Sequence, residues 1–145
     1  MPLTRDEDIA DLLRTARTIA MIGASDRPDR PSNGVMRALQ GHGYRVIPVN
    51  PNITGEHLFG EFIWRDLSQV GVPIDIVDIF RRSDAAGEAV DQAILAGAKA
   101  VWLQLGVIDE EAATRAEAAG LTVVMDRCIK IEMLRLGIPR VEQIG

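Results

Sequence analysis

The residues best suited to bind an anion lie where an apolar run meets a helical pattern, within residues 19–36. The apolar run stops at Gly23, the small residues Ala24 and Ser25 follow it, and Ser32 opens the helical pattern. A strand, a tight turn and a helix N-terminus in this order can receive a phosphate, because the helix end presents free N–H donors and about half a positive charge. The segment therefore predicts a site for a phosphate-containing ligand.

Four arginines lie close to such turns. Arg27 and Arg30 belong to this loop, whereas Arg81 and Arg82 directly follow a later apolar run. A guanidinium can hold a phosphate through two hydrogen bonds, although each of these arginines can equally be a solvated surface residue. Because adjacent side chains diverge, we expect one of Arg81 and Arg82 to face the ligand and the other to pair with the acid at position 84 or 88.

The usual NAD-binding pattern is incomplete in this sequence. Of its three glycines, only Gly23 is in place. The acid that binds the ribose hydroxyls at the end of the second strand is replaced by Asn50, which Pro51 follows. The sequence therefore favours a phosphate ligand other than NAD.

The elements that must position these residues alternate along the chain. Apolar runs predict strands at Thr18–Ile22, 44–50, 74–80, 99–105 and 121–125, and helical patterns occupy 5–15, the segment from about 32 to 43, the segment from 83 to 97, 110–119 and 129–136. This order predicts a doubly wound, three-layer α/β fold with a mainly parallel five-stranded sheet. In such a sheet ligands gather outside the carboxyl ends of the strands, at the point where the strand order reverses.

Several local features lead to narrower expectations. Thr4 and Glu7 have the spacing of a capping box for the first helix, and Ser83 has the position of a helix cap. Pro48 is awkward for a central strand, since proline removes a ladder donor. Residues 53–72 are expected to form a loop with a short helical turn near 66–69.

Composition excludes several classes of protein. Of the 145 residues, 47% are hydrophobic and 26% charged, the net charge is −5, and there is a single cysteine. The acidic balance argues against non-specific binding to nucleic acid or anionic membranes, and no run approaches the ~18 apolar residues of a membrane span. We therefore expect a cytoplasmic protein without internal disulfide or metal. The aromatic residues Phe59, Phe62 and Trp64 in the irregular segment suggest a homodimer.

With these residues in place, the chain resembles the CoA-binding domain family, and more closely its small stand-alone branch. The family's module also forms the N-terminal part of the succinyl-CoA synthetase α subunit and of ADP-forming acyl-CoA synthetases. The resemblance implies that residues 1–145 form a single Rossmann-like domain that binds coenzyme A, a nucleotide. It rests on segments spread over nearly the whole chain: residues 22–25, 30–32, 46–51, 78–82, 97–99, 101–106 and 124–128.

The resemblance also assigns site residues by position. The pyrophosphate would lie on the loop after the first strand, the adenosine beside the second strand, and the pantetheine along the later strands. The binding residues that it implies are Gly23, Ala24, Ser25, Asn50, Pro51, Phe80, Arg81 and Gln104. The helix start and the charge of the loops add Ser32, Arg30 and Arg82 as candidates.

The sequence shows no catalyst to accompany this ligand. The related synthetases use a phosphorylated histidine in a second domain, and neither His42 nor His57 matches it. Cys128 follows the last strand beside Arg127, which would favour a thiolate, but a small apolar role is the more usual one. We therefore expect binding of CoA or an acyl-CoA without catalysis. An NAD(P)-dependent oxidoreductase and the CoA-binding subunit of a split acyl-CoA synthetase are the alternatives.

Overall fold

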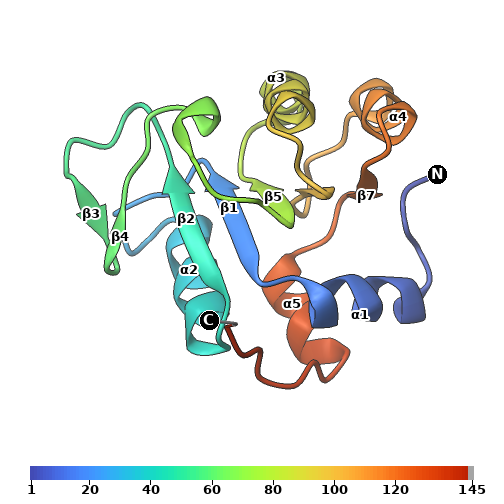
Figure 1. The fold of residues 1–145 in the computed structure, drawn as a ribbon, viewed down its shortest axis with the longest axis horizontal. Helices are drawn as coiled ribbons and strands as arrows, with labels where there is room; N and C mark the ends of the chain where they lie inside the picture. Colours follow the sequence, from blue (N-terminus) through green and yellow to red (C-terminus); the bar gives the residue numbers. More distant parts are fainter. Residues whose placement is uncertain (144–145) are drawn as a thin grey trace.

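A parallel sheet of five strands forms the centre of the computed structural model, which describes residues 1–143 (Figure 1). The strands are β1 (Thr18–Ile22), β2 (Arg45–Val49), β5 (Ile76–Ile79), β6 (Ala100–Leu103) and β7 (Thr122–Val124). They lie in the order β2-β1-β5-β6-β7, and every pairing is parallel. The predicted five-stranded α/β fold is confirmed.

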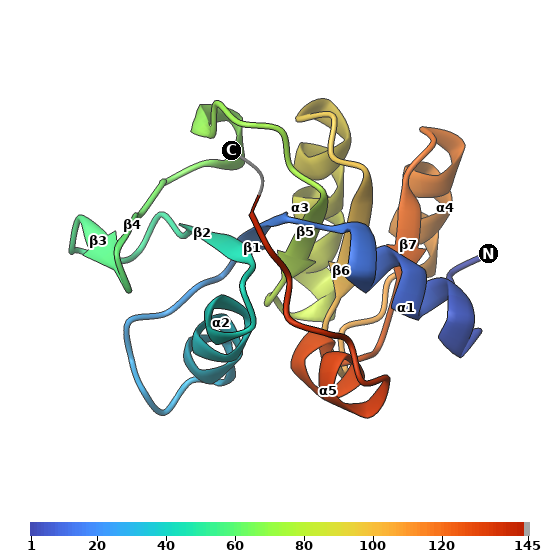
Figure 2. The ribbon, with the colours of Figure 1, turned by 60° about the horizontal axis from the view of Figure 1, so that its bottom comes forward.

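Helices cover both faces of this sheet, as Figures 1 and 2 show. One face carries α1 (Asp6–Thr15), α2 (Pro31–Gly41) and α5 (Ile129–Arg135). The other carries α3 (Ser83–Leu95) and α4 (Glu110–Ala118). Each layer of helices closes one apolar cluster against the strands, because successive strand residues point to opposite faces.

The strand order reverses beside β1. From β1 the chain passes through α2 to β2 at one edge, and it later returns to place β5 on the other side of β1. Gly23 and Phe80 follow these two central strands. Gly23 has a φ of 87°, and a Cβ there would meet the backbone oxygen of Phe80 at 2.1 Å. Only glycine fits this close approach.

Strand β2 accommodates Pro48 because it lies at the edge of the sheet. The carbonyl of Pro48 accepts a hydrogen bond from the Trp64 N–H, at 3.0 Å on the side away from β1. The missing N–H of Pro48 therefore also faces outward and costs no bond to β1.

The irregular segment contains more structure than the sequence predicted. The 3-10 helix η1 (Leu67–Gln69) confirms the expected turn, and Asp66 caps it. Before it, β3 (His57–Leu58) and β4 (Glu61–Phe62) form a small hairpin that was not expected. Its turn contains Phe59 at φ 48° and Gly60 at φ 84°.

Two predicted helix caps are wrong. Helix α1 begins at Asp6 after Arg5, so Thr4 lies too early to cap it, and Glu7 pairs with Arg5 at 3.1 Å instead. Ser83 lies inside α3, where its hydroxyl accepts from the Ile108 N–H at 3.0 Å and lies 3.3 Å from the Gly106 carbonyl. It joins the start of α3 to the loop after β6 rather than capping a helix.

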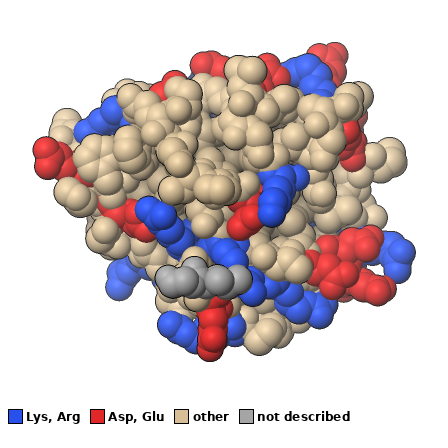
Figure 3. All heavy atoms as spheres, viewed as in Figure 1, with Lys and Arg blue, Asp and Glu red and all other residues tan. Residues whose placement is uncertain are grey.

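The surface mixes charges of both signs. On the face drawn in Figure 3, acidic and basic side chains are interspersed. No helix within residues 1–143 is long and apolar enough to cross a membrane.

Candidate functional site

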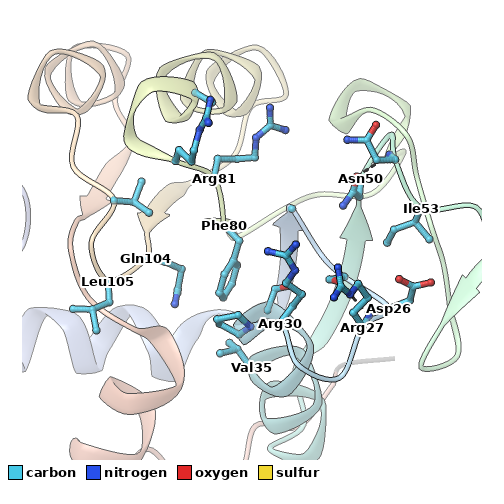
Figure 4. Close-up of a pocket in the computed structure, with 18 of the residues that line it drawn as sticks. Asp26, Arg27, Arg30, Val35, Asn50, Ile53, Phe80, Arg81, Gln104 and Leu105 are labelled. Carbon is cyan, nitrogen blue, oxygen red and sulfur yellow. Dashed lines mark hydrogen bonds between the residues drawn. The ribbon is translucent and has the colours of Figure 1, made fainter.

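A cavity of about 980 Å³ opens along the carboxyl edge of the sheet (Figure 4). The loops after β1, β2, β5 and β6 line it, together with the first turns of α2, α3 and α5. It spans the point where the strand order reverses, which is where open α/β sheets bind ligands.

The loop after β1 forms one wall with its backbone. Among the described residues, the N–H groups of Ala24, Ser25 and Ser32 donate to no protein acceptor. Helix α2 begins at Pro31, one residue before the predicted start, and Pro31 suits that position because its missing N–H would be unpaired there. The free N–H groups and the helix dipole together favour an anion at this wall.

Two asparagines fix this loop in place. Asn33 donates from its side-chain amide to the Ser25 carbonyl at 3.0 Å, and Asn50 donates to the Ala24 carbonyl at 2.7 Å. The side-chain oxygen of Asn50 also accepts from the Asn52 N–H at 2.8 Å. The loops after β1 and β2 are thus joined before any ligand arrives, which lowers the entropic cost of binding.

The four arginines differ in their partners. Arg27 pairs with Asp29 and Arg82 with Asp84, each at 3.2 Å. Within residues 1–143, Arg30 and Arg81 form no ion pair. All four line the cavity, and Figure 4 shows Arg30 and Arg81 there. As expected, one of the two adjacent arginines, Arg82, pairs with an acid, and the other, Arg81, does not. Among the described residues, the guanidinium groups of Arg30 and Arg81 are therefore the ones available to an anion.

The part of the cavity that follows β6 and β7 is lined by uncharged side chains. Gln104 is buried, and its side-chain oxygen accepts from the Ile129 N–H at 3.2 Å. Its amide nitrogen has no protein acceptor among the described residues, so it can donate to a ligand carbonyl. Cys128 is half-buried and lines the same end. The guanidinium of the neighbouring Arg127 binds Glu132 at 2.6 Å.

A buried carboxyl lies within the sheet, below Phe80. Asp78 is on the same face of β5 as Phe80, two residues earlier, between Met21 of β1 and Trp102 of β6. Neither of its oxygens has a hydrogen-bond partner within the described chain. Burial raises the pKa of Asp78 well above its usual range, so the group favours its neutral form.

Most of the predicted site residues converge on the cavity. The lining contains Gly23, Ser25, Arg30, Ser32, Asn50, Phe80, Arg81, Arg82 and Gln104. Ala24 is not part of the lining, since its side chain is buried in the core and only its backbone belongs to the wall. Pro51 is exposed beside Asn50 and does not line the cavity either.

Other lining residues were missed as site residues. They include Val35, Asn52, Ile53, Leu105, Val107 and Ile131. In the sequence, the five aliphatic residues of this set are indistinguishable from core residues. Asn33 fixes the loop after β1. Its role could have been suspected from the sequence, because it is a polar residue in the first turn of a predicted helix. Among residues 1–143 no group of three metal-ligating side chains comes together.

Comparison with known proteins places this geometry in a family. Residues 17–133 match a family described as a CoA binding domain. The uncharacterized protein YneT of Bacillus subtilis is 40% identical over 124 residues, which cover 86% of this chain and 90% of YneT.

Solved structures share the fold. A hypothetical protein from Pyrococcus horikoshii superimposes with a TM-score of 0.87 at 39% identity, over 94% of this chain and 96% of that protein. A dinucleotide-forming acetyl-coenzyme A synthetase from Ca. Korarchaeum cryptofilum gives a TM-score of 0.68 at 28% identity. That similarity covers 79% of this chain but 27% of the synthetase.

Proposed function

Because this chain belongs to the CoA binding domain family, we propose that it binds coenzyme A in the cavity at the carboxyl edge of its sheet. The observation that carries the proposal is the arrangement of charge in that cavity. Unpaired N–H groups of the β1 loop and of α2 lie beside Arg30 and Arg81, which lack ion-pair partners within the described chain. Backbone N–H groups at a helix start and arginine side chains are both suited to bind the pyrophosphate and the ribose phosphate of CoA.

The order of residues along the edge suits the parts of CoA in sequence. Asn50 and Ile53, after β2, border the adenosine. The β1 loop binds the pyrophosphate, and the arginines bind the phosphates that remain exposed. The pantetheine then passes Phe80 toward Gln104, whose free amide nitrogen donates to one of its carbonyls.

Neither histidine of the chain lies where the proposed ligand would bind. His42 contacts the Ile138 carbonyl at 2.5 Å, and His57 lies on the β3–β4 hairpin. Neither lines the cavity. We therefore propose that the ligand is held, sensed or delivered.

A second candidate follows from the synthetase similarity. The chain would then be the CoA-binding subunit of a split acyl-CoA synthetase, with the remaining domains on another polypeptide. This candidate predicts that affinity purification from the native cell recovers a partner carrying a phosphorylated histidine.

Calorimetric titration with a ligand series tests the primary proposal. CoA is expected to bind at least about tenfold more tightly than dephospho-CoA, because one charge-assisted contact contributes about 1.5–3 kcal/mol. NAD⁺ is expected to bind more weakly than either, since the ribose-binding acid is absent. No heat change with millimolar CoA would overturn the proposal, and tighter binding of NAD⁺ would favour the oxidoreductase alternative.

A further inference from the structure

One end of the cavity is aliphatic. From Gln104 onward the lining consists of Leu105, Val107, Cys128 and Ile131, none of which carries a charge. Leu105 is 65% exposed and Ile131 is 53% exposed, although both are large apolar residues. Exposed apolar side chains that share one cavity indicate a surface that an apolar ligand group can cover.

The fold holds Leu105 in this exposed position. The Val107 N–H donates to the Gln104 carbonyl at 2.8 Å, which closes a tight turn with Leu105 at its tip. The Gly106 N–H donates to the Asp126 side chain at 2.7 Å, which ties that turn to the end of β7. Leu105 is therefore presented to the cavity by a fixed turn.

Helix α5 extends the aliphatic surface. Its buried side contains Ile129 and Met133, so Ile131 and Leu134 face outward. Leu134 is 61% exposed and lies three residues beyond Ile131, which places it on the same side of the helix. Together, Leu105, Ile131 and Leu134 form an aliphatic strip.

The strip lies at the other end of the site from Arg27 and Arg30. In Figure 4, Leu105 and Gln104 lie on one side of Phe80, and Arg27 and Arg30 lie on the other. The sheet order gives the same arrangement, since Arg27 and Arg30 follow β1, whereas Leu105 and Ile131 follow β6 and β7. Arg81 and Arg82 follow β5 and lie between these two ends. A ligand that fits both ends carries phosphates at one end and a hydrocarbon at the other.

We propose that the preferred ligand is an acyl-CoA thioester, whose aliphatic chain lies on this strip. The inference rests on the proposed function, which places the CoA thiol beyond Gln104. Free CoA ends in a single sulfur and leaves Leu105, Ile131 and Leu134 in water. An acyl chain on that sulfur covers them, and each methylene that leaves water favours binding.

Calorimetry with CoA, acetyl-CoA and octanoyl-CoA tests the inference on the full chain. Octanoyl-CoA is expected to bind at least about tenfold more tightly than acetyl-CoA, since full burial of one methylene contributes up to about fourfold. In a Leu105→Ser, Ile131→Ser double variant, the ratio of the two dissociation constants should fall to near one. The control Leu95→Ser changes an 88% exposed leucine on α3, outside this cavity, and should keep the ratio.

The outcomes separate the two proposals. If CoA binds but octanoyl-CoA binds no better than acetyl-CoA, the acyl inference is wrong and the CoA proposal stands. If the octanoyl preference survives in the double variant, the chain lies elsewhere and the inference is equally overturned. If neither CoA nor octanoyl-CoA binds, the proposed function itself fails.

Discussion

Asp78 places a carboxyl in the middle of the central strand, where it is 0% exposed. Both oxygens lack partners within residues 1–143, and burial raises the pKa of the group well above 3.8. In the unfolded chain the same carboxyl ionises near its usual pKa. The folded state therefore binds more protons, and the protein loses stability as the pH rises from about 3.8 toward the folded pKa.

The variant Asp78→Asn removes this titration with little change of shape. Its free energy of unfolding at pH 8 is expected to exceed that of the wild type by more than about 1 kcal/mol, and the difference should vanish below about pH 4. Urea unfolding at several pH values measures both. Glu88→Gln, on the exposed side of α3, serves as the control, and parallel pH profiles for wild type and Asp78→Asn would refute the expectation.

At the scale of elements, an ion-pair network centred on the buried Glu132 joins α5 to α1. Glu132 binds Arg127 and Arg135 at 2.6 Å each, and Arg135 reaches Asp6 of α1 at 2.7 Å. Burial alone would raise the pKa of Glu132, but the two arginines outweigh it and hold that pKa below 4.5. The network thereby fixes the helix that carries Ile131.

Replacing Glu132 with glutamine should therefore lower the free energy of unfolding at pH 7 by about 2 kcal/mol, because two guanidinium groups lose their carboxylate. The deficit should shrink as the pH falls below 4.5 and the wild-type carboxylate becomes protonated. Thermal or urea unfolding measures it. Glu7→Gln breaks an exposed pair and should have little effect; an equal loss in both variants would contradict this role of burial.

The elements also show what the sequence could and could not reveal. The five strands were predictable, since each is a short, mainly apolar run bounded by turn residues, as buried strands of a parallel sheet are. The β3–β4 hairpin was not, because two-residue strands are too short to have a periodicity. The roles of Ser83 and Asn33 depend on loops that meet only in the folded chain. Leu105 and Ile131 have the residue types of core positions, and only the folded chain shows that they are exposed at the cavity.

At the scale of the whole molecule, parallel topology gathers distant segments at one edge. The chain has a net charge of −5, yet four arginines from two loops line one cavity. The loop after β1 and the loop after β5 are far apart in sequence and adjacent in space, because β1 and β5 pair. Self-association through Phe59 and Phe62, which the structure leaves exposed, stays a prediction for sedimentation measurements.

The role of this edge is tested most directly by titrating CoA into an Arg30→Gln, Arg81→Gln double variant. The dissociation constant is expected to rise about tenfold or more, since two unpaired guanidinium groups lose their charge. Arg5→Gln removes the same charge from an exposed residue before α1 and should bind CoA as the wild type does. Unchanged CoA affinity in the double variant, with the fold intact by circular dichroism, would show that the phosphates do not bind there.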